Sequence, residues 1–225
     1  MNLTEMNLFQ QAILTASAMV MFMSFLLLSQ SRVISTIHTF AAQSVLIVLI
    51  TGLVAIEERE LHLAWSALLT LVLKVIFIPW LLHRIARKFR IQRAADIMYS
   101  PALVMLAGGA IAIFCYYIAL PIERYIEGIT RPIVAISMTT VMLGFLILIT
   151  RSKAISQVIG FMAIENGLFL AAVSATQGMP MIVEIGVAFD VLVAAIIFGV
   201  FFFQMKESFD SFDVDHLNQL SEGDA

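Results

Sequence analysis

Seven long apolar segments constrain the fold of this chain more than any other feature of its sequence. They run near residues 8–29, 36–56, 61–83, 101–121, 132–150, 154–175 and 181–204. Each has about the 17–25 residues that an α-helix needs to cross the ~30 Å hydrocarbon core of a bilayer. Charged residues make up only 13% of the chain, about half of the roughly 25% found in soluble domains. We therefore predict an all-α integral membrane protein, a bundle of about seven transmembrane helices.

Basic residues are distributed unevenly between the two sides of this predicted bundle. Nine of the 13 Lys and Arg residues fall in the loops after the first, third and fifth segments or after the last segment. The opposite side holds three basic residues, Arg59, Arg124 and Arg131. Lys and Arg are enriched in cytoplasmic loops. The sequence thus predicts a multi-pass protein of the cell inner (plasma) membrane, with the N-terminus outside and the C-terminus in the cytoplasm.

Two carboxylates lie where the hydrocarbon should be. Glu165 is near the middle of SQVIGFMAIENGLFLAAVSA, and Asp190 is near the middle of MIVEIGVAFDVLVAAIIFGVFFF. Each has about ten apolar-rich residues on either side, which places it ~15 Å from the end of its helix. An ionised carboxylate at this depth costs at least ~2.5 kcal/mol, and such residues typically mark proton pathways. We therefore predict that Glu165 and Asp190 are proton relay sites.

Lys74, in the third segment, is a further intramembrane charge, and its role has two interpretations. A buried lysine that loses its proton readily can act in a relay with the acids. Alternatively, Lys74 is a fixed counter-ion of one carboxylate, since breaking a buried pair costs about 3–5 kcal/mol. The signs of the three charges do not balance, so at least one acid must be protonated or paired elsewhere. Gln43, in the second segment, is more typical of an interhelical hydrogen bond than of a proton path.

The sequence offers no set of side chains suited to a metal or redox centre. Cys115 is the only cysteine, so no disulfide can form within the chain, and no Cys/His cluster with metal-ligand spacing is present. We therefore expect no cofactor and no metal in this chain. Any redox chemistry that the protein serves would be carried out on another chain.

Two short motifs give the last three segments a family resemblance. GFMAIENGLFLAA has one glutamate in mid-span, and AFDVLVAA follows with an acid in an alanine-rich setting. Residues 132–204 thereby resemble the three-helix K-type subunit of complex I and the C-type subunit of multisubunit cation/proton antiporters. The whole layout, with four helices in front, resembles component E of hydrogenase-4, a membrane-arm subunit of group 4 nickel–iron hydrogenases and formate hydrogenlyase-type complexes.

The K-type resemblance implies roles for the two acids and a division of the chain. K-type subunits carry intramembrane glutamates on their second and third helices, within a hydrophilic axis that carries protons. Glu165 matches the first, and Asp190 matches the second in position but is one methylene shorter. Lys74 lies in the added helices and has no K-type counterpart. The chain divides into a four-helix membrane region (1–131), a K-type-like three-helix region (132–205) and an acidic cytoplasmic tail (206–225).

These resemblances predict a non-catalytic subunit that provides part of an intramembrane proton path in a hydrogenase or complex I-like redox complex. The expected partners are antiporter-like and other membrane-arm subunits, a soluble redox module of the nickel–iron hydrogenase type, the lipid bilayer and protons. Nucleic acid is not expected as a partner. Two alternatives stay open: a subunit of a multisubunit cation/proton antiporter, and a purely structural membrane anchor.

Overall fold

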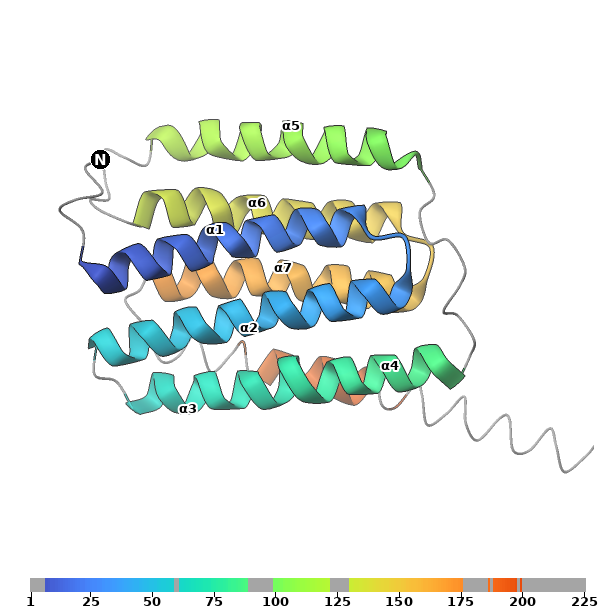
Figure 1. The fold of residues 1–225 in the computed structure, drawn as a ribbon, viewed down its shortest axis with the longest axis horizontal. Coiled ribbons are helices and arrows are strands. Elements are labelled where there is room, and N and C mark those ends of the chain that lie inside the picture. Colours follow the sequence, from blue (N-terminus) through green and yellow to red (C-terminus); the bar gives the residue numbers. More distant parts are fainter. Residues whose placement is uncertain are drawn as a thin grey trace, which may run out of the picture.

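The protein is a bundle of long apolar helices that lie side by side (Figure 1). The computed structural model describes residues 7–58, 61–88, 99–121, 130–175, 186, 188–197 and 199. Within these ranges nearly every residue is helical and no β-strand is present. The predicted class, an all-α membrane bundle, is therefore confirmed.

Six helices in the described part of the chain are long and apolar enough to cross a membrane. They are α1 (Leu8–Ser29), α2 (Val33–Glu58), a continuous helix formed by α3 (Leu61–Thr70), η2 (Leu71–Phe77) and α4 (Ile78–Lys88), then α5 (Pro101–Ala119), α6 (Thr130–Thr150) and α7 (Ala154–Ala175). A shorter apolar helix, Ala188–Ile197, follows, and we call it the last helix.

The first six predicted spans correspond to these six helices. The third helix continues to Lys88, beyond the predicted end at residue 83. Its last turns carry Arg84 and Arg87, whose long side chains can keep their charged heads in water while the helix continues. Most of the seventh predicted span, 181–204, and the whole predicted tail, 206–225, lie outside the described residues.

α7 lies at the centre of the bundle, and α5 lies at its edge (Figure 1). Among the described residues, α7 packs against α6 and α2, whereas α5 packs mainly against α6 and, less extensively, against α1. The most polar of the six spanning helices is thus also the most buried one. This placement follows from the cost of exposing polar side chains to hydrocarbon, which favours burying them between helices.

Small residues allow α6 and α7 to pack with their backbones nearly in contact. A Cβ atom added to Gly144 of α6 would lie 2.9 Å from the carbonyl oxygen of Gly160 and 2.9 Å from the amide nitrogen of Ile164. An added Cβ on Gly167 of α7 would lie 2.9 Å from the amide nitrogen of Val141. Since backbone atoms cannot turn away as side chains do, the α6–α7 interface depends on these glycines.

We expect Gly144→Ala to force α6 and α7 apart and to destabilise the protein by about 1–3 kcal/mol, the usual cost of overpacking. Gly109→Ala on α5 is the matched control, because a Cβ there meets nothing within 4 Å. Thermal unfolding in detergent would compare the two variants. Equal midpoints for Gly144→Ala and Gly109→Ala would contradict the proposed role of this contact.

Lys74 lies in the π-helical segment η2, which ends two residues before Pro79. The amide of Ile78 donates to the carbonyl of Leu73, five residues earlier. Proline has no amide hydrogen and its ring disturbs the turn before it, and a π-helical turn inside an α-helix is one way to accommodate this. The wider turn sets the direction in which the fully buried side chain of Lys74 leaves the helix.

Arg151, one of the nine basic residues expected on the cytoplasmic side, lies in the predicted loop but is buried, with 2% of its surface exposed. It lies in the short α6–α7 connection, and its Nη2 donates to the carbonyl oxygens of Leu27 at 3.1 Å and Leu28 at 2.8 Å. These carbonyls belong to the last turns of α1, where free carbonyl groups and the helix dipole favour a cation. Arg151 thus ties the α6–α7 connection to the end of α1.

Candidate functional site

A layer of buried polar side chains crosses the middle of the bundle, between two apolar clusters. Each of α1, α2, α6 and α7 contributes apolar residues to both clusters. Each changes from one cluster to the other at buried polar residues. We call the following set the polar layer: Ser24, Gln43, Ser44, Lys74, Thr140, Glu165, Asn166 and Asp190. Because the helices run side by side, this layer extends across the bundle rather than along it (Figure 1).

The three charged residues of the polar layer meet at one point. The ammonium nitrogen Nζ of Lys74 lies 3.1 Å from Oε1 of Glu165 and 3.2 Å from Oδ1 of Asp190. Lys74 comes from η2, Glu165 from α7 and Asp190 from the last helix. The exposed fractions of their side chains are 1%, 10% and 2%. We call these three residues the charge cluster.

Asn166 holds the ammonium group of Lys74 from a third side. Nζ donates a hydrogen bond of 3.1 Å to Oδ1 of Asn166, and Nδ2 of Asn166 donates to Oε1 of Gln43 at 3.3 Å. Nε2 of Gln43 then donates to Oγ of Ser24 at 2.8 Å, and this hydroxyl donates to the carbonyl oxygen of Val20 at 3.0 Å. In this series of hydrogen bonds, each residue donates to the next one away from Lys74. The hydrogen-bonded row therefore presents an acceptor oxygen to the amino group of Lys74 and fixes the position of that group.

The charge cluster carries an odd number of charges in an apolar surrounding. With every group ionised, two carboxylates and one ammonium leave a net charge of −1 among apolar clusters on either side. Such a charge in a low-dielectric interior is costly, and binding one proton removes it. Two acids from different helices thus face one cation, and a single added proton would make the cluster neutral. Asn166 and Gln43 have no ionisable group, and their hydrogen bonds hold Lys74 in position.

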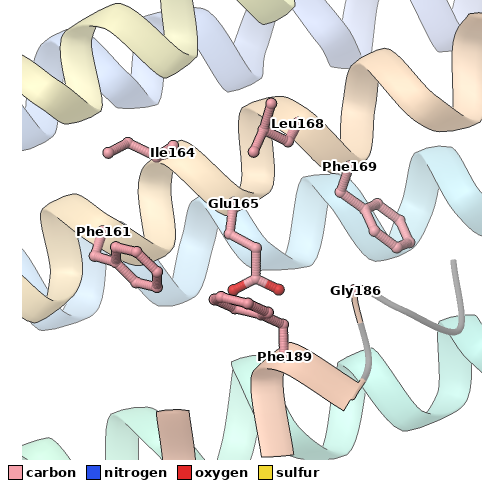
Figure 2. Close-up of a pocket in the computed structure, with 7 residues that line it drawn as sticks. All are labelled: Phe161, Ile164, Glu165, Leu168, Phe169, Gly186 and Phe189. Carbon is pink, nitrogen blue, oxygen red and sulfur yellow. The ribbon is translucent and has the colours of Figure 1, made fainter. Parts of the chain in front are cut away.

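An apolar pocket of about 360 Å³ opens beside the charge cluster, between α7 and the last helix. Figure 2 shows the carboxylate of Glu165 pointing into this space, toward Phe189. The other lining residues are Phe161, Ile164, Leu168, Phe169 and Gly186. The rings of Phe161 and Phe189 stack with centroids 5.8 Å apart. Among the described residues that line the pocket, Glu165 is the only ionisable one.

The comparisons with known proteins add a relationship to this geometry. Hydrogenase-4 component E of Escherichia coli is 25% identical to this chain over 182 residues, which cover 80% of this chain and 84% of that protein. The predicted resemblance to this component is confirmed. An uncharacterized protein of Mycobacterium tuberculosis is 29% identical over 185 residues, covering 82% of this chain and 84% of that protein. No protein-family model matches the chain, and no solved structure gives a significant match.

The similarity and the apolar helices together indicate a multi-pass membrane protein. The resemblance of residues 132–204 to the K-type subunit of complex I stays a prediction, as does the division of the chain at residues 131 and 205. Helices from both sides of residue 131 share the two apolar clusters. Among the described residues, no three His, Cys, Asp or Glu side chains form a group that could hold a metal ion.

The structure brings all three predicted relay residues, Lys74, Glu165 and Asp190, within contact of one another. It also places Gln43 as the sequence suggested, in hydrogen bonds between helices. Sequence reasoning did not identify Asn166 or Ser24 as partners of this group. Asn166 follows Glu165 directly, and its mid-span position was the available signal.

Proposed function

We propose that this chain is a membrane subunit of a hydrogenase-type redox complex and that the charge cluster moves protons within the membrane. The similarity to a protein named hydrogenase-4 component E and the apolar helices support the first part. The word "component" implies further subunits, and the chain offers no predicted redox centre of its own. We propose antiporter-like and other membrane-arm subunits, together with a soluble hydrogenase-type module, as partners.

One observation carries the proposal for proton movement: a single ammonium group lies within 3.2 Å of carboxylates from two different helices. A structural ion pair needs one acid for one base, and a second buried acid adds a desolvation cost without a matching charge. A proton relay, in contrast, needs at least two sites between which a proton can move. Lys74 lies between Glu165 and Asp190 and can donate to one acid and accept from the other.

The arrangement of the polar layer supports a path that runs parallel to the membrane plane. Its hydrogen bonds connect α1, α2, α7 and η2 at about the same depth. The hydrogen-bonded row contains no ionisable group beyond Lys74 and ends at the carbonyl of Val20. We therefore assign proton transfer to the charge cluster, and the positioning of Lys74 to Asn166 and Gln43. The uneven distribution of basic residues supports a C-terminus in the cytoplasm and an N-terminus on the other side of the plasma membrane.

The geometry favours protons over sodium as the transported ion. A dehydrated sodium ion requires about five or six oxygen ligands, as other hard cations do. Here the ammonium of Lys74 already occupies the position between Glu165, Asp190 and Asn166, at 3.1–3.2 Å from one oxygen of each. A metal cation at this point would have to displace the lysine. A proton needs only one acceptor oxygen.

We expect Asp190→Asn to reduce proton coupling strongly, and Asp190→Glu to retain part of it because an acid with a longer reach survives. Turnover of the intact complex should respond to pH and to protonophores and should be unchanged in sodium-free buffer. Hydrogen-dependent or formate-dependent turnover in membrane vesicles, with and without sodium, measures both effects. A requirement for millimolar sodium that disappears in Asp190→Asn would support the cation/proton antiporter alternative instead.

A further inference from the structure

Among the described residues, the carboxylate of Glu165 has an ion-pair partner but no hydrogen-bond donor with good geometry. Oε1 lies 3.1 Å from the Lys74 ammonium without hydrogen-bond geometry, and neither Oε1 nor Oε2 accepts a hydrogen bond from the described residues. A buried carboxylate without hydrogen-bond donors carries a desolvation cost that the protein usually avoids. The pocket between α7 and the last helix is the space into which this carboxylate points (Figure 2).

The depth of the pocket restricts what can fill it. Glu165 lies 11 residues after the first residue of α7 and 10 before the last, which is ~15 Å from either helix end. Lipid headgroups lie outside the hydrocarbon core, so their polar groups cannot reach this depth without distorting the bilayer. Acyl chains reach it but carry no hydrogen-bond donor. Filling the pocket with lipid would therefore leave Glu165 as it is.

We propose that the pocket receives a basic side chain from a transmembrane helix of a neighbouring subunit, and that this side chain binds the carboxylate of Glu165. The inference rests on the proposed function, because it requires a membrane partner. A basic residue supplies the hydrogen-bond donor that the described residues do not provide to Glu165, and its positive charge attracts this carboxylate when Glu165 is ionised. A transmembrane helix can hold such a residue at mid-depth, because the pocket shields it from lipid.

The apolar lining suits this partner. Leu168, Phe161 and Phe189 are 56%, 37% and 41% exposed and form a rim against which a second helix can pack (Figure 2). Phe rings also attract a cation that lies over their faces, as Phe169 already does for Lys74, with Nζ 5.8 Å from its ring centroid. Packing and charge thus favour the same occupant.

Photo-crosslinking in membranes of the complete complex tests this docking site. The photoreactive residue p-benzoylphenylalanine replaces Phe161 at the pocket, and Phe114 on α5 serves as the aromatic control, since it is 59% exposed and lies on the helix at the edge of the bundle. We expect the photoreactive residue at position 161 to form a crosslink to a transmembrane segment of another subunit. The crosslinked position should lie within about one helical turn of a Lys, Arg or His. Phe114 should not give this product.

Crosslinks from Phe161 to lipid alone, to a second copy of this chain, or to a segment without a basic residue in that turn would overturn the docking proposal. The same product from Phe114 in equal yield would overturn it as well. A second measurement fills the pocket with Leu168→Trp and uses Leu106→Trp, exposed on α5, as control. We expect Leu168→Trp to lower the amount of the crosslinked subunit that copurifies by at least several-fold, and an unchanged amount would contradict the proposal.

Failure of this inference can be told apart from failure of the proposed function. If the pocket has no basic partner but Glu165→Gln still abolishes proton coupling, the relay stands and the docking site does not. If Glu165→Gln leaves coupling unchanged while the crosslink forms beside a basic residue, the docking site is structural and the relay is wrong.

Discussion

Replacing Lys74 with methionine is expected to reduce the level of the assembled protein severely. The substitution removes the only basic residue within the charge cluster and leaves two carboxylates, Glu165 and Asp190, facing each other in an apolar interior. Removing one member of a buried pair costs about 3–5 kcal/mol, because the remaining charge stays buried without compensation. Methionine has a similar length, so packing alone would cost far less. Lys153→Met, at the α6–α7 connection, is the control for the loss of a lysine.

The protein level that Lys74→Met lowers should recover when the unpaired carboxylates are neutralised as well. Combining Lys74→Met with Asp190→Asn or with Glu165→Gln removes one stranded charge, and combining all three substitutions removes both. Membrane immunoblots and thermal stability in detergent should show partial recovery in each double variant and more in the triple variant. Purely additive losses in both pairs would contradict direct coupling between Lys74 and the acids.

The fold could be predicted from the sequence because span length is a local property. Each of the first six segments has the apolar length that a bilayer requires, and the predicted spans correspond to α1 through α7. The extension of α4 to Lys88 and the burial of Arg151 were not predicted. Both depend on where a long basic side chain can place its charged head, which the neighbouring helix decides: Arg151 donates to carbonyls at the end of α1.

The depth of each charged residue could also be predicted, but its partners could not. The number of residues between Glu165 and the ends of its helix fixes how deep it lies, and the same holds for Lys74 and Asp190. Which way each side chain points around its helix depends on packing, since helices that are apolar on nearly all sides give little signal of orientation. The meeting of the three charges therefore required the structure.

The neutral members of the polar layer were harder to identify than the charged ones. Asn166 and Ser24 carry no charge, so their cost within a membrane does not mark them as functional. Pro79 disturbs the helix before it, but the π-helical turn η2, which places Lys74, also packs against α2, and this packing is not visible in the sequence.

Glu165→Gln is expected to leave the complex assembled but to abolish most of the proton movement that is coupled to its redox reaction. Glutamine keeps the size of the side chain and its hydrogen-bonding capacity, but its amide cannot bind and release a proton as a carboxylate does. The loss of one negative charge also leaves Lys74 paired with Asp190, at 3.2 Å, so the cluster becomes neutral rather than unbalanced. Glu57→Gln, which removes an exposed carboxylate at the end of α2, is the matched control.

Proton uptake into inverted membrane vesicles during turnover, measured with a pH-sensitive dye and normalised to the amount of assembled complex, tests the account most directly. The account predicts that Glu165→Gln lowers the number of protons moved per turnover at least tenfold, while Glu57→Gln moves as many as the unmodified protein. A Glu165→Gln complex that moves as many protons per turnover as the unmodified complex would contradict a proton relay through the charge cluster.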